Sequence, residues 1–237
     1  MPSKTHASSR SPAPSKSAVR RFLATFQPLC HTAAGRTAVA EHGCPPFVDG
    51  SCRREPDFEA ARPAITALSR GAQFAPRLRV TDHVAYLTTV GRYAGADKVA
   101  GEEHWRLVAL LRVAQRFESH ADAAAWYARS RLALPRNLVV PGNPPLAFEL
   151  TDGGDADPER EVPRATVKRW EVLHRARATE HGAVLVCDVI FRELTDPPAI
   201  TRAEWQSWCG GVPRTRTPPV IMAPLWNRLL RLAERRG

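Results

Sequence analysis

The sequence lacks an apolar run long enough to cross a bilayer. Its longest apolar stretch, from Gly182 to Phe191, is interrupted by Asp188. A membrane-spanning helix needs roughly 18 to 20 consecutive apolar residues, and this stretch is much shorter. We therefore expect a soluble protein without a membrane partner.

Several catalytic and nucleotide-binding signatures are also missing. The chain contains no GxGxxG after an expected strand, no GxxxxGK[ST], no HExxH and no GxSxG. These absences disfavour nucleotide hydrolysis by a P-loop and the chemistry of ordinary serine hydrolases. We also expect no cofactor.

Cysteine is scarce and odd in number, with five residues in the chain. No apolar segment follows the basic start, so a secreted disulfide scaffold is disfavoured and a reducing, cytoplasmic environment is expected. Zinc selects thiolate and imidazole ligands, and several lie close together in the sequence: Cys30, His31, His42, Cys44 and Cys52. They form neither a Cys-x-x-Cys nor a His-x(3–5)-His pair. We expect ordinary thiols and keep a zinc site as the alternative.

Basic residues outnumber acidic ones, with 34 Lys and Arg against 24 Asp and Glu and a formal net charge of +10. The excess is uneven, because residues 1–21 contain five basic residues and no acidic one. Guanidinium groups favour phosphate as a partner over a general attraction to membrane charge. The alternative is that the arginines serve only solubility in a chain encoded by GC-rich DNA.

Composition divides the chain into three parts. With 43% hydrophobic and 24% charged residues, the 237-residue chain has enough apolar area for one core. We expect residues 1–18, rich in Ser, Pro, Lys and Ala, to form a disordered basic arm, and residues 19–213 to form a single α+β domain. Residues 214–237 are expected to form a linker and an amphipathic C-terminal helix. One side of this helix would contain Leu225, Leu229 and Leu232, and the other side would contain Arg228, Arg231 and Arg235.

Periodicity and turn signals predict the elements of the central part. The stretch from Val19 to Phe26 is compatible with a short helix or a strand, and the proline-rich residues 42–62 with an irregular loop. Strands are predicted after a turn at Thr81-Asp82, over residues 104–117 and over 183–192. Helices are predicted from Ser119, from Pro163 to His181, and from Thr201 to Gly210. Their expected inward faces are Ala121, Ala124, Ala125, Ala128 and Leu132 in the first, and Val167, Trp170 and Leu173 in the second.

The irregular loop contains the residues best suited to acid–base chemistry. Its carboxylates, next to Arg53 and Arg54, are Asp49, Glu55, Asp57 and Glu59. Such a group is compatible with a general acid–base pair or a divalent-metal site. The alternative is that these carboxylates cap turns and pair with neighbouring arginines.

Aromatic and arginine residues are interleaved around the loop and the two strands that follow it. The rings are Phe47, Phe74, Tyr86, Tyr93, Trp105 and Phe117, and the arginines are Arg53, Arg54, Arg70, Arg77, Arg92 and Arg106. Aromatic faces next to guanidinium groups can hold an unpaired base while its phosphate is bound. The alternative is that most rings belong to the core. Tyr86 and Trp105 are the expected exceptions, because each has a polar atom that needs a partner.

The order of elements resembles that of the PUA-like superfamily, which includes EVE, ASCH and YTH domains. There a Gly-Asp turn enters a strand, the next strand forms one wall of a small barrel, and a helix leads away. The matching stretches here are VTDHVAYLTTVGRYAG, HWRLVALLRVAQRFES and the helix that starts at Ser119. Thr81-Asp82 stands where Gly-Asp is usual, and Asp also supports a turn.

The preceding stretches, HGCPPFVDGSCRREPDFE and ITALSRGAQFAPRLRVTD, resemble phage and bacterial nucleotide-modification-associated domains. Together the resemblance covers about residues 40–150, with 183–192 as a further barrel strand. It implies an α+β fold with a small, strongly curved mixed β-barrel and flanking helices. It also implies one open pocket that receives a flipped or modified base, or handles a modified nucleotide.

We therefore expect a nucleic-acid-associated protein that binds a modified base and performs no catalysis, with DNA favoured over RNA. Flipping a base out of a duplex costs only a few kcal/mol. Stacking on the flipped base and hydrogen bonds to its edge offset this cost. The expected contacts are Tyr86, Trp105 and Phe47 for the base face, Asp49 and Asn143 for its edge, and Arg53, Arg54 and Arg92 for phosphate. One alternative is an enzyme of base or nucleotide modification that uses Asp49, Glu55 and Asp57. Another is a protein-interaction module that docks through its arginine-rich C-terminal helix.

Overall fold

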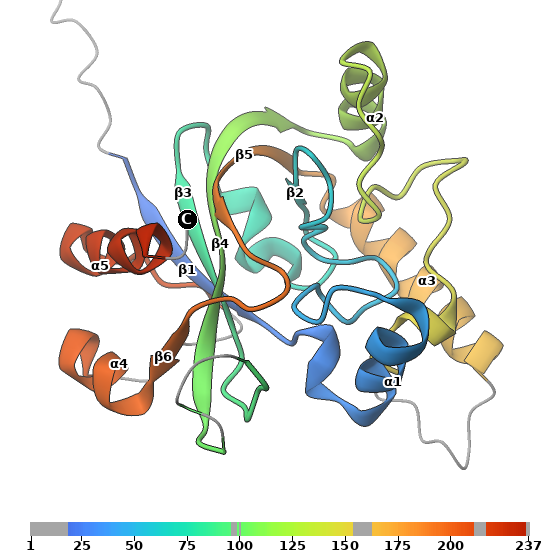
Figure 1. Cartoon of the computed structure of the whole chain (residues 1–237). Helices are drawn as coiled ribbons and strands as arrows, with labels where there is room; N and C mark the ends of the chain where they lie inside the picture. Colours follow the sequence, from blue (N-terminus) through green and yellow to red (C-terminus); the bar gives the residue numbers. More distant parts are fainter. Residues whose placement is uncertain (1–18, 96–98, 100, 154–162, 211–216, 236–237) are drawn as a thin grey trace, which may run out of the picture.

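A mixed β-sheet that curls into a half-barrel organises the molecule (Figure 1). The computed structural model describes residues 19–95, 99, 101–153, 163–210 and 217–235, so the predicted arm at 1–18 lies outside the described residues. The strands are β1 (Arg21–Phe26), β2 (Ala64–Ile65), β3 (His83–Thr88), β4 (His104–Phe117), β5 (Val184–Arg192) and β6 (Ala199–Thr201). Their order is β1-β3-β4-β5-β2, and β6 pairs with β4. β1 and β3 are parallel, and the other pairs are antiparallel.

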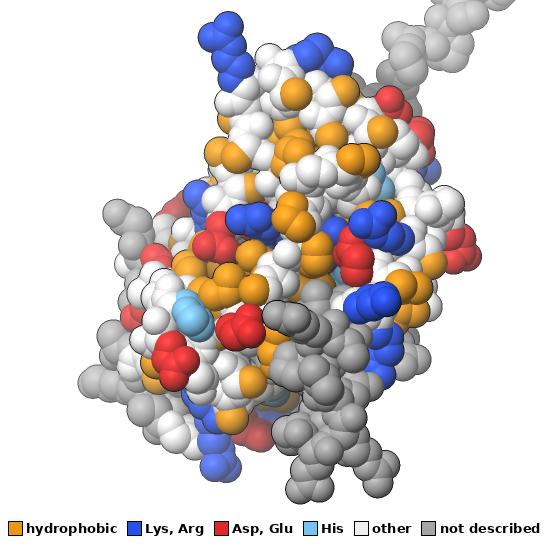
Figure 2. All heavy atoms as spheres, turned by 90° about the vertical axis from the view of Figure 1, so that its right-hand side faces the viewer, with side chains coloured by type: hydrophobic (Ala, Val, Ile, Leu, Met, Phe, Trp, Pro, Cys, Tyr) orange, Lys and Arg blue, Asp and Glu red, His pale blue; other side chains and the backbone are white. Residues whose placement is uncertain are grey.

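Helices lie on both sides of this sheet. They are α1 (Ala33–His42), α2 (His120–Arg129), α3 (Pro163–Glu180), α4 (Arg202–Cys209) and α5 (Ala223–Glu234). Figure 1 shows α4 and α5 together on one side, and α1, α3 and the long loops on the other. On the side with α2 and α3, acidic and basic side chains are interspersed with apolar ones (Figure 2). Within the described residues, no helix has both the length and the apolar character needed to span a bilayer.

Local sequence signals explain the strand and helix ends. The predicted strand over residues 104–117 is confirmed as β4, which is buried on both faces over most of its length. Register shifts in its pairing with β5 allow the long strand to bend. Ser119 caps α2 by accepting a hydrogen bond from the Asp122 backbone N–H, and Thr201 and Glu204 form a reciprocal capping box on α4. Gly210 ends α4 in the left-handed conformation that glycine adopts without strain.

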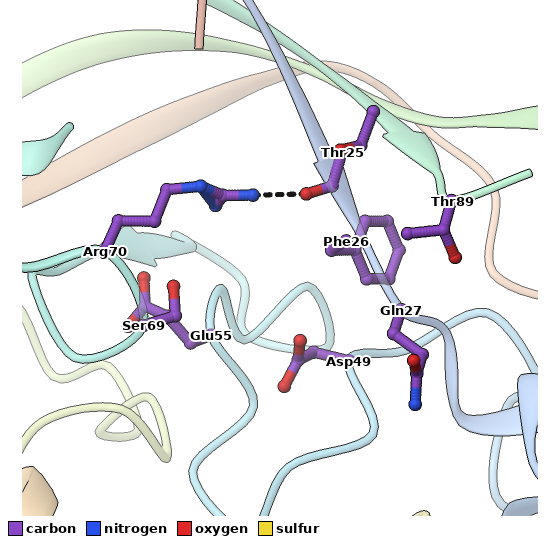
Figure 3. A pocket seen from close by; sticks show the side chains of 8 residues that line it. All are labelled: Thr25, Phe26, Gln27, Asp49, Glu55, Ser69, Arg70 and Thr89. Carbon is purple, nitrogen blue, oxygen red and sulfur yellow. Dashed lines mark hydrogen bonds between the residues drawn. The ribbon is translucent and has the colours of Figure 1, made fainter. Parts of the chain in front are cut away.

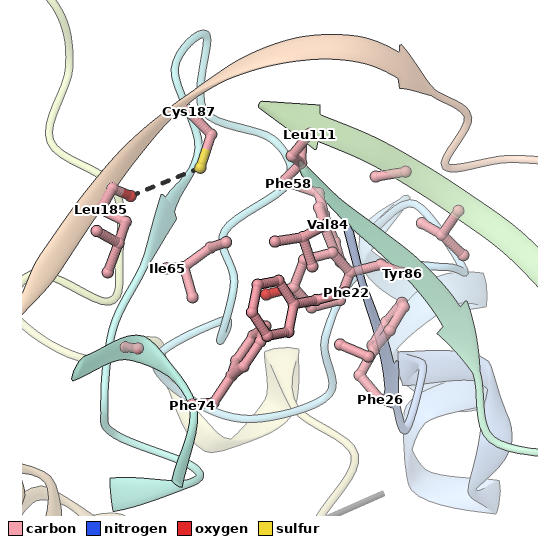
Figure 4. Close-up of a cluster of buried hydrophobic side chains, with 14 of the residues drawn as sticks. Phe22, Phe26, Phe58, Ile65, Phe74, Val84, Tyr86, Leu111, Leu185 and Cys187 are labelled. Atoms are coloured by element: carbon pink, nitrogen blue, oxygen red, sulfur yellow. Dashed lines mark hydrogen bonds between the residues drawn. The ribbon is translucent and has the colours of Figure 1, made fainter. Parts of the chain in front are cut away.

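The sheet separates two apolar clusters because side chains alternate along each strand. From β1, Phe22, Ala24 and Phe26 enter the cluster on the inner side of the half-barrel, whereas Leu23 enters the cluster beneath α4 and α5. The inner cluster includes rings from strands and loops alike (Figure 4). The Phe58 ring centroid lies 5.1 Å from that of Phe26 and 5.2 Å from that of Tyr86.

The predicted inward faces of two helices are confirmed only in part. In α2 the fully buried side chains are His120, Ala123 and Tyr127. Of the predicted stripe, Ala124 and Leu132 are partly buried, and the remaining members are exposed: Ala121, Ala125 and Ala128. Tyr127 has a larger apolar side chain than the alanines, and its hydroxyl donates to the backbone oxygen of Arg62 at the end of the irregular loop. Burial of this side chain determines which face of the helix points to the core. In α3, Leu173 is 48% exposed and Trp170 is partly buried against Phe148. The side chain of Val167 lies outside the described part of the chain.

Phe58→Ala tests how strongly the loop depends on the inner core. Phe58 is fully buried, so the cavity is expected to lower the free energy of unfolding by about 3–5 kcal/mol. Urea unfolding followed by circular dichroism measures this loss. Phe58→Leu, which keeps most of the volume, should lose clearly less. Equal stability of wild type and the alanine variant would show that the loop folds independently of the half-barrel.

Candidate functional site

A polar pocket lies at the sheet edge where β1 and β3 end. Because these strands are parallel, both carboxyl ends meet at this edge and place Gln27 and Thr89 side by side. The irregular loop and the turn after β2 complete the walls. The pocket has a volume of about 250 Å³, and we name it the Asp49–Glu55 pocket (Figure 3). Its lining residues are Thr25, Phe26, Gln27, Asp49, Glu55, Ser69, Arg70 and Thr89.

Asp49 contributes a carboxylate that is largely removed from water. Its Oδ1 accepts hydrogen bonds from the Ser51 backbone N–H at 3.0 Å and from Ser51 Oγ at 2.5 Å. Burial raises the pKa of Asp49, the hydrogen bonds from Ser51 oppose the shift, and the neighbouring Asp152 carboxylate adds to it. Because burial dominates, the carboxylate accepts a proton more readily than a carboxylate in water.

Glu55 is buried deeper and is held by both oxygens. Oε1 accepts from the Thr66 backbone N–H at 2.9 Å, and Oε2 accepts from Asn137 Nδ2 at 3.0 Å and from the Thr66 hydroxyl. Burial raises the pKa of Glu55 to about 7, although these hydrogen bonds act in the opposite direction. Near neutral pH the group is therefore populated in both protonation states, which is what a general acid or base requires.

Arg70 supplies positive charge at the same pocket. Figure 3 shows its guanidinium reaching from the Ser69 side towards β1, where Nη2 donates to the backbone oxygen of Thr25. Two carboxylates and one guanidinium therefore line one small space. Such a site offers hydrogen-bond acceptors and a cation to a ligand that carries both N–H groups and negative charge.

Asp152 connects two segments next to the pocket. Its Oδ2 accepts from Gln27 Nε2 at 3.1 Å, and its backbone N–H donates to the Gly50 oxygen at 2.9 Å. A Cβ at Gly50 would lie 2.3 Å from Asp152 Oδ2, so only glycine permits this approach. Gln27 and Asp152 were missed by the sequence analysis, because they are far apart in sequence and belong to no motif.

Arg53 and Arg54 are not phosphate contacts, and this part of the sequence-based prediction is wrong. They are 1% and 2% exposed. Arg53 forms a bidentate ion pair with Glu171 of α3, with the shortest contact at 2.6 Å, and donates to the backbone oxygen of Asn143 at 2.7 Å. Arg54 donates to the backbone oxygens of Asp49 at 2.5 Å and Leu150 at 2.8 Å. The two guanidinium groups hold the irregular loop in place instead.

Arg54 also adopts a backbone conformation that L-residues avoid. Its φ is +48°, in the left-handed region. The two hydrogen bonds of its side chain hold this conformation, which lies one residue before Glu55. Local backbone strain that neighbouring contacts maintain is typical of functional sites. Arg54 therefore positions the backbone of Asp49 through its hydrogen bond to the carbonyl oxygen of that residue.

Tyr86 and Trp105 do not enclose a common cavity, so the prediction of two stacking walls is wrong. Tyr86 is 1% exposed in the inner cluster, and Trp105 is 3% exposed in the cluster beneath α4, with its ring centroid 5.7 Å from that of Trp205. The two residues lie on adjacent strands but point to opposite faces of the sheet. Neither ring is accessible to a base.

Three further predicted residues have separate roles. The Asn143 amide donates to the backbone oxygens of Pro135 and Leu138, at 2.9 and 2.7 Å, so it does not read a base edge here. Phe47 and the exposed Arg92 line a different pocket of about 540 Å³, together with Tyr93. Of the residues predicted to contact a base or phosphate, Asp49 is thus the member that lines the Asp49–Glu55 pocket.

The remaining carboxylates and thiols do not extend this site. Asp57 accepts from the backbone N–H groups of Glu59 and Arg136, so it stabilises loops and does not line the pocket. In the described ranges, no three His, Cys, Asp or Glu side chains are grouped in a way that could hold a metal ion. Burial raises the pKa of Cys30 to about 11 and that of Cys52 to about 12, which keeps both as thiols near neutral pH.

Comparison with protein-family models finds no match to this chain, and comparisons with curated proteins and with solved structures find none either.

The pH dependence of stability tests the burial of Glu55. An acid whose pKa rises from 4.5 in the unfolded chain to about 7 in the folded one binds more protons when folded, so its contribution to stability is lost as pH rises through this window. The loss amounts to roughly 3 kcal/mol. Urea unfolding of wild type and Glu55→Gln at several pH values measures the difference, which should fall with rising pH. Parallel curves would show that folding does not shift the pKa of Glu55.

Proposed function

We propose that this protein is nucleic-acid-associated and that the Asp49–Glu55 pocket binds a single nucleobase within a PUA-like half-barrel. The observation that carries the proposal is the convergence of a buried carboxylate, Glu55, a half-buried one, Asp49, and a guanidinium at the open edge of a curled sheet. A volume of about 250 Å³ lies below the roughly 300–1,000 Å³ typical of drug-sized ligands, which favours one heterocycle over a larger cofactor.

The chemistry of the pocket favours a base with N–H donors on its edge. Carboxylates accept hydrogen bonds from exocyclic amino groups, as Asp and Glu do with cytosine in DNA recognition. A flipped base is commonly read through its Watson–Crick edge, and the pocket presents Asp49 and Glu55 for such an edge. Arg70 is placed to attract the phosphate that follows the base. The net charge of +10 supports a polyanionic partner, and the resemblance to PUA-like and nucleotide-modification-associated domains adds an argument by analogy.

Nucleoside titrations followed by calorimetry test the pocket. Guanosine, cytidine and adenosine should bind more tightly than thymidine or uridine, because the latter lack an exocyclic amino group. Asp49→Asn should weaken this binding by about tenfold to a hundredfold, because it removes a charged acceptor. Ser69→Trp should also abolish binding, because this exposed residue lies on the pocket wall.

Glu59→Gln is the matched control, since Glu59 is a carboxylate of the same loop that does not line the pocket. It should bind nucleosides like wild type. Binding that survives both Asp49→Asn and Ser69→Trp would place the ligand elsewhere and contradict the proposal.

A second candidate function is acid–base chemistry on the bound base or nucleotide. It is favoured by the pKa of about 7 at Glu55, which suits proton transfer near neutral pH. Incubation with nucleotides or DNA and Mg²⁺, followed by mass spectrometry, would reveal a product. Glu55→Gln should then abolish turnover even at nucleoside concentrations that saturate the weakened binding expected of this variant, because the proton-transferring group is lost. Absence of product with wild-type protein and all substrates would leave base binding alone.

A further inference from the structure

A row of arginines leads away from the Asp49–Glu55 pocket along residues 69–80. A hollow of about 390 Å³ adjoins the pocket and shares Ser69 and Arg70 with it; its other lining residues are Gly71, Gln73 and Arg177. A further hollow of about 500 Å³ follows along the same segment. It is lined by Arg20, Pro76, Arg77, Leu78, Arg79, Val80 and Arg116. We name Arg70, Arg77, Arg79 and Arg177 the arginine track.

The backbone of this segment makes the two hollows neighbours. Residues Gly71–Gln73 and Ala75–Arg77 form two consecutive single turns of 3-10 helix. The Gln73 backbone N–H donates to the Arg70 oxygen at 3.1 Å, and Arg77 Nη1 donates to the Gln73 oxygen at 3.3 Å. A guanidinium from the second hollow therefore reaches back to the turn that lines the first one.

The charged residues that line these two hollows are all arginines. Arg20 is paired with Asp82 at 2.5 Å and Arg116 with Glu118 at 2.8 Å. Arg77, Arg79 and Arg177 are exposed, and within the described residues none of them has an acidic partner. Arg177 Nη1 donates to the backbone oxygen of Leu68, but the positive charge of the three guanidinium groups is not neutralised by this bond and is available to an anion from solution.

We propose that the arginine track binds the sugar-phosphate backbone of a nucleic-acid strand whose base occupies the Asp49–Glu55 pocket. This inference rests on the proposed function and names its partner as a single-stranded segment. Guanidinium groups bind phosphate bidentately, and a positively charged groove that follows a flexible strand is typical of single-strand binding. Val80 is 47% exposed between these arginines and offers an apolar contact to a sugar or a base. Arg70 belongs to both sites, so it joins the base pocket to the phosphate path.

Charge reversal of the exposed members tests the track. In Arg77→Glu/Arg79→Glu, the affinity for a fluorescent single-stranded oligonucleotide should fall by about tenfold to a hundredfold, because two charge-assisted contacts are lost. The slope of log affinity against log salt should become shallower by about 0.7 for each lost phosphate contact. Anisotropy titrations at several salt concentrations measure both quantities, with DNA and RNA oligonucleotides as separate arms.

A matched control uses a pair of exposed arginines on α5. Arg228→Glu/Arg231→Glu changes the same amount of charge on α5, where both side chains are exposed next to Trp208. This variant should keep most of the affinity and most of the salt slope. If it loses affinity while Arg77→Glu/Arg79→Glu binds like wild type, the track is wrong and α5 forms the anionic contact.

Nucleoside binding separates failure of the track from failure of the pocket. Arg77→Glu/Arg79→Glu should bind free nucleosides like wild type, because neither residue lines the Asp49–Glu55 pocket, and this result also shows that the variant is folded. If nucleosides bind in the pocket but oligonucleotide affinity is unchanged by the substitution, only the track is overturned. If oligonucleotide binding depends on the track while no nucleoside binds, the base pocket is overturned and the track stands.

Discussion

The candidate site depends on two guanidinium groups buried beneath the irregular loop. Arg53 ties the loop to α3 through Glu171, and Arg54 ties it to the backbone oxygens of Asp49 and Leu150. Removing one partner of a buried ion pair costs about 3–5 kcal/mol, because the other charge stays in the interior without compensation. The loop therefore keeps one conformation although it has no regular hydrogen-bonded ladder of its own, and Asp49 and Glu55 keep their positions with it.

The same burial gives the pocket its chemistry. Glu55 is separated from water by the chain around it, so its pKa lies near neutrality even though Thr66 and Asn137 donate to it. Asp49 is subject to the same desolvation and to repulsion from Asp152. The contacts that stabilise the loop thus also make its carboxylates responsive to protons and to N–H donors.

Arginine has two distinct roles in this protein. Arg53, Arg54 and Arg106 are almost completely buried and donate to backbone oxygens or ion-pair partners, so they act as structural cross-links. Arg77 and Arg79 are exposed on a segment that leads into the pocket, and their charge is directed to the solvent. The net charge alone does not distinguish these roles, because it counts a buried cation and an exposed one equally.

Local signals in the sequence determined much of the secondary structure. The strand at 104–117, the strand after Gly182, the Ser119 and Thr201 caps and the irregular nature of residues 42–62 were all predicted and are confirmed. The strand after Gly182 was expected to be buried, and only its first four residues are. These features depend on neighbouring residues, on periodicity and on turn chemistry, so a linear sequence contains them. The curled sheet was implied by the resemblance to PUA-like domains, and the structure confirms a mixed α+β fold whose sheet curls into a half-barrel. The PUA-like identity stays a proposal.

Only the tertiary structure decided which side chains face a ligand. Alternation along β3 and β4 indicates that neighbouring residues point to opposite faces of the sheet, but it does not indicate which face helices or loops cover. Tyr86 and Trp105 were therefore wrongly predicted to be exposed, because both faces are covered. The pocket joins segments near residues 27, 49–55, 70 and 89. The parallel pairing of β1 with β3 brings the first and last together, and long-range hydrogen bonds add the other two. Such contacts are far apart in sequence and leave no periodic signal. The chain thus encodes its elements locally, whereas its site exists only after long-range packing has buried some charges and left others exposed.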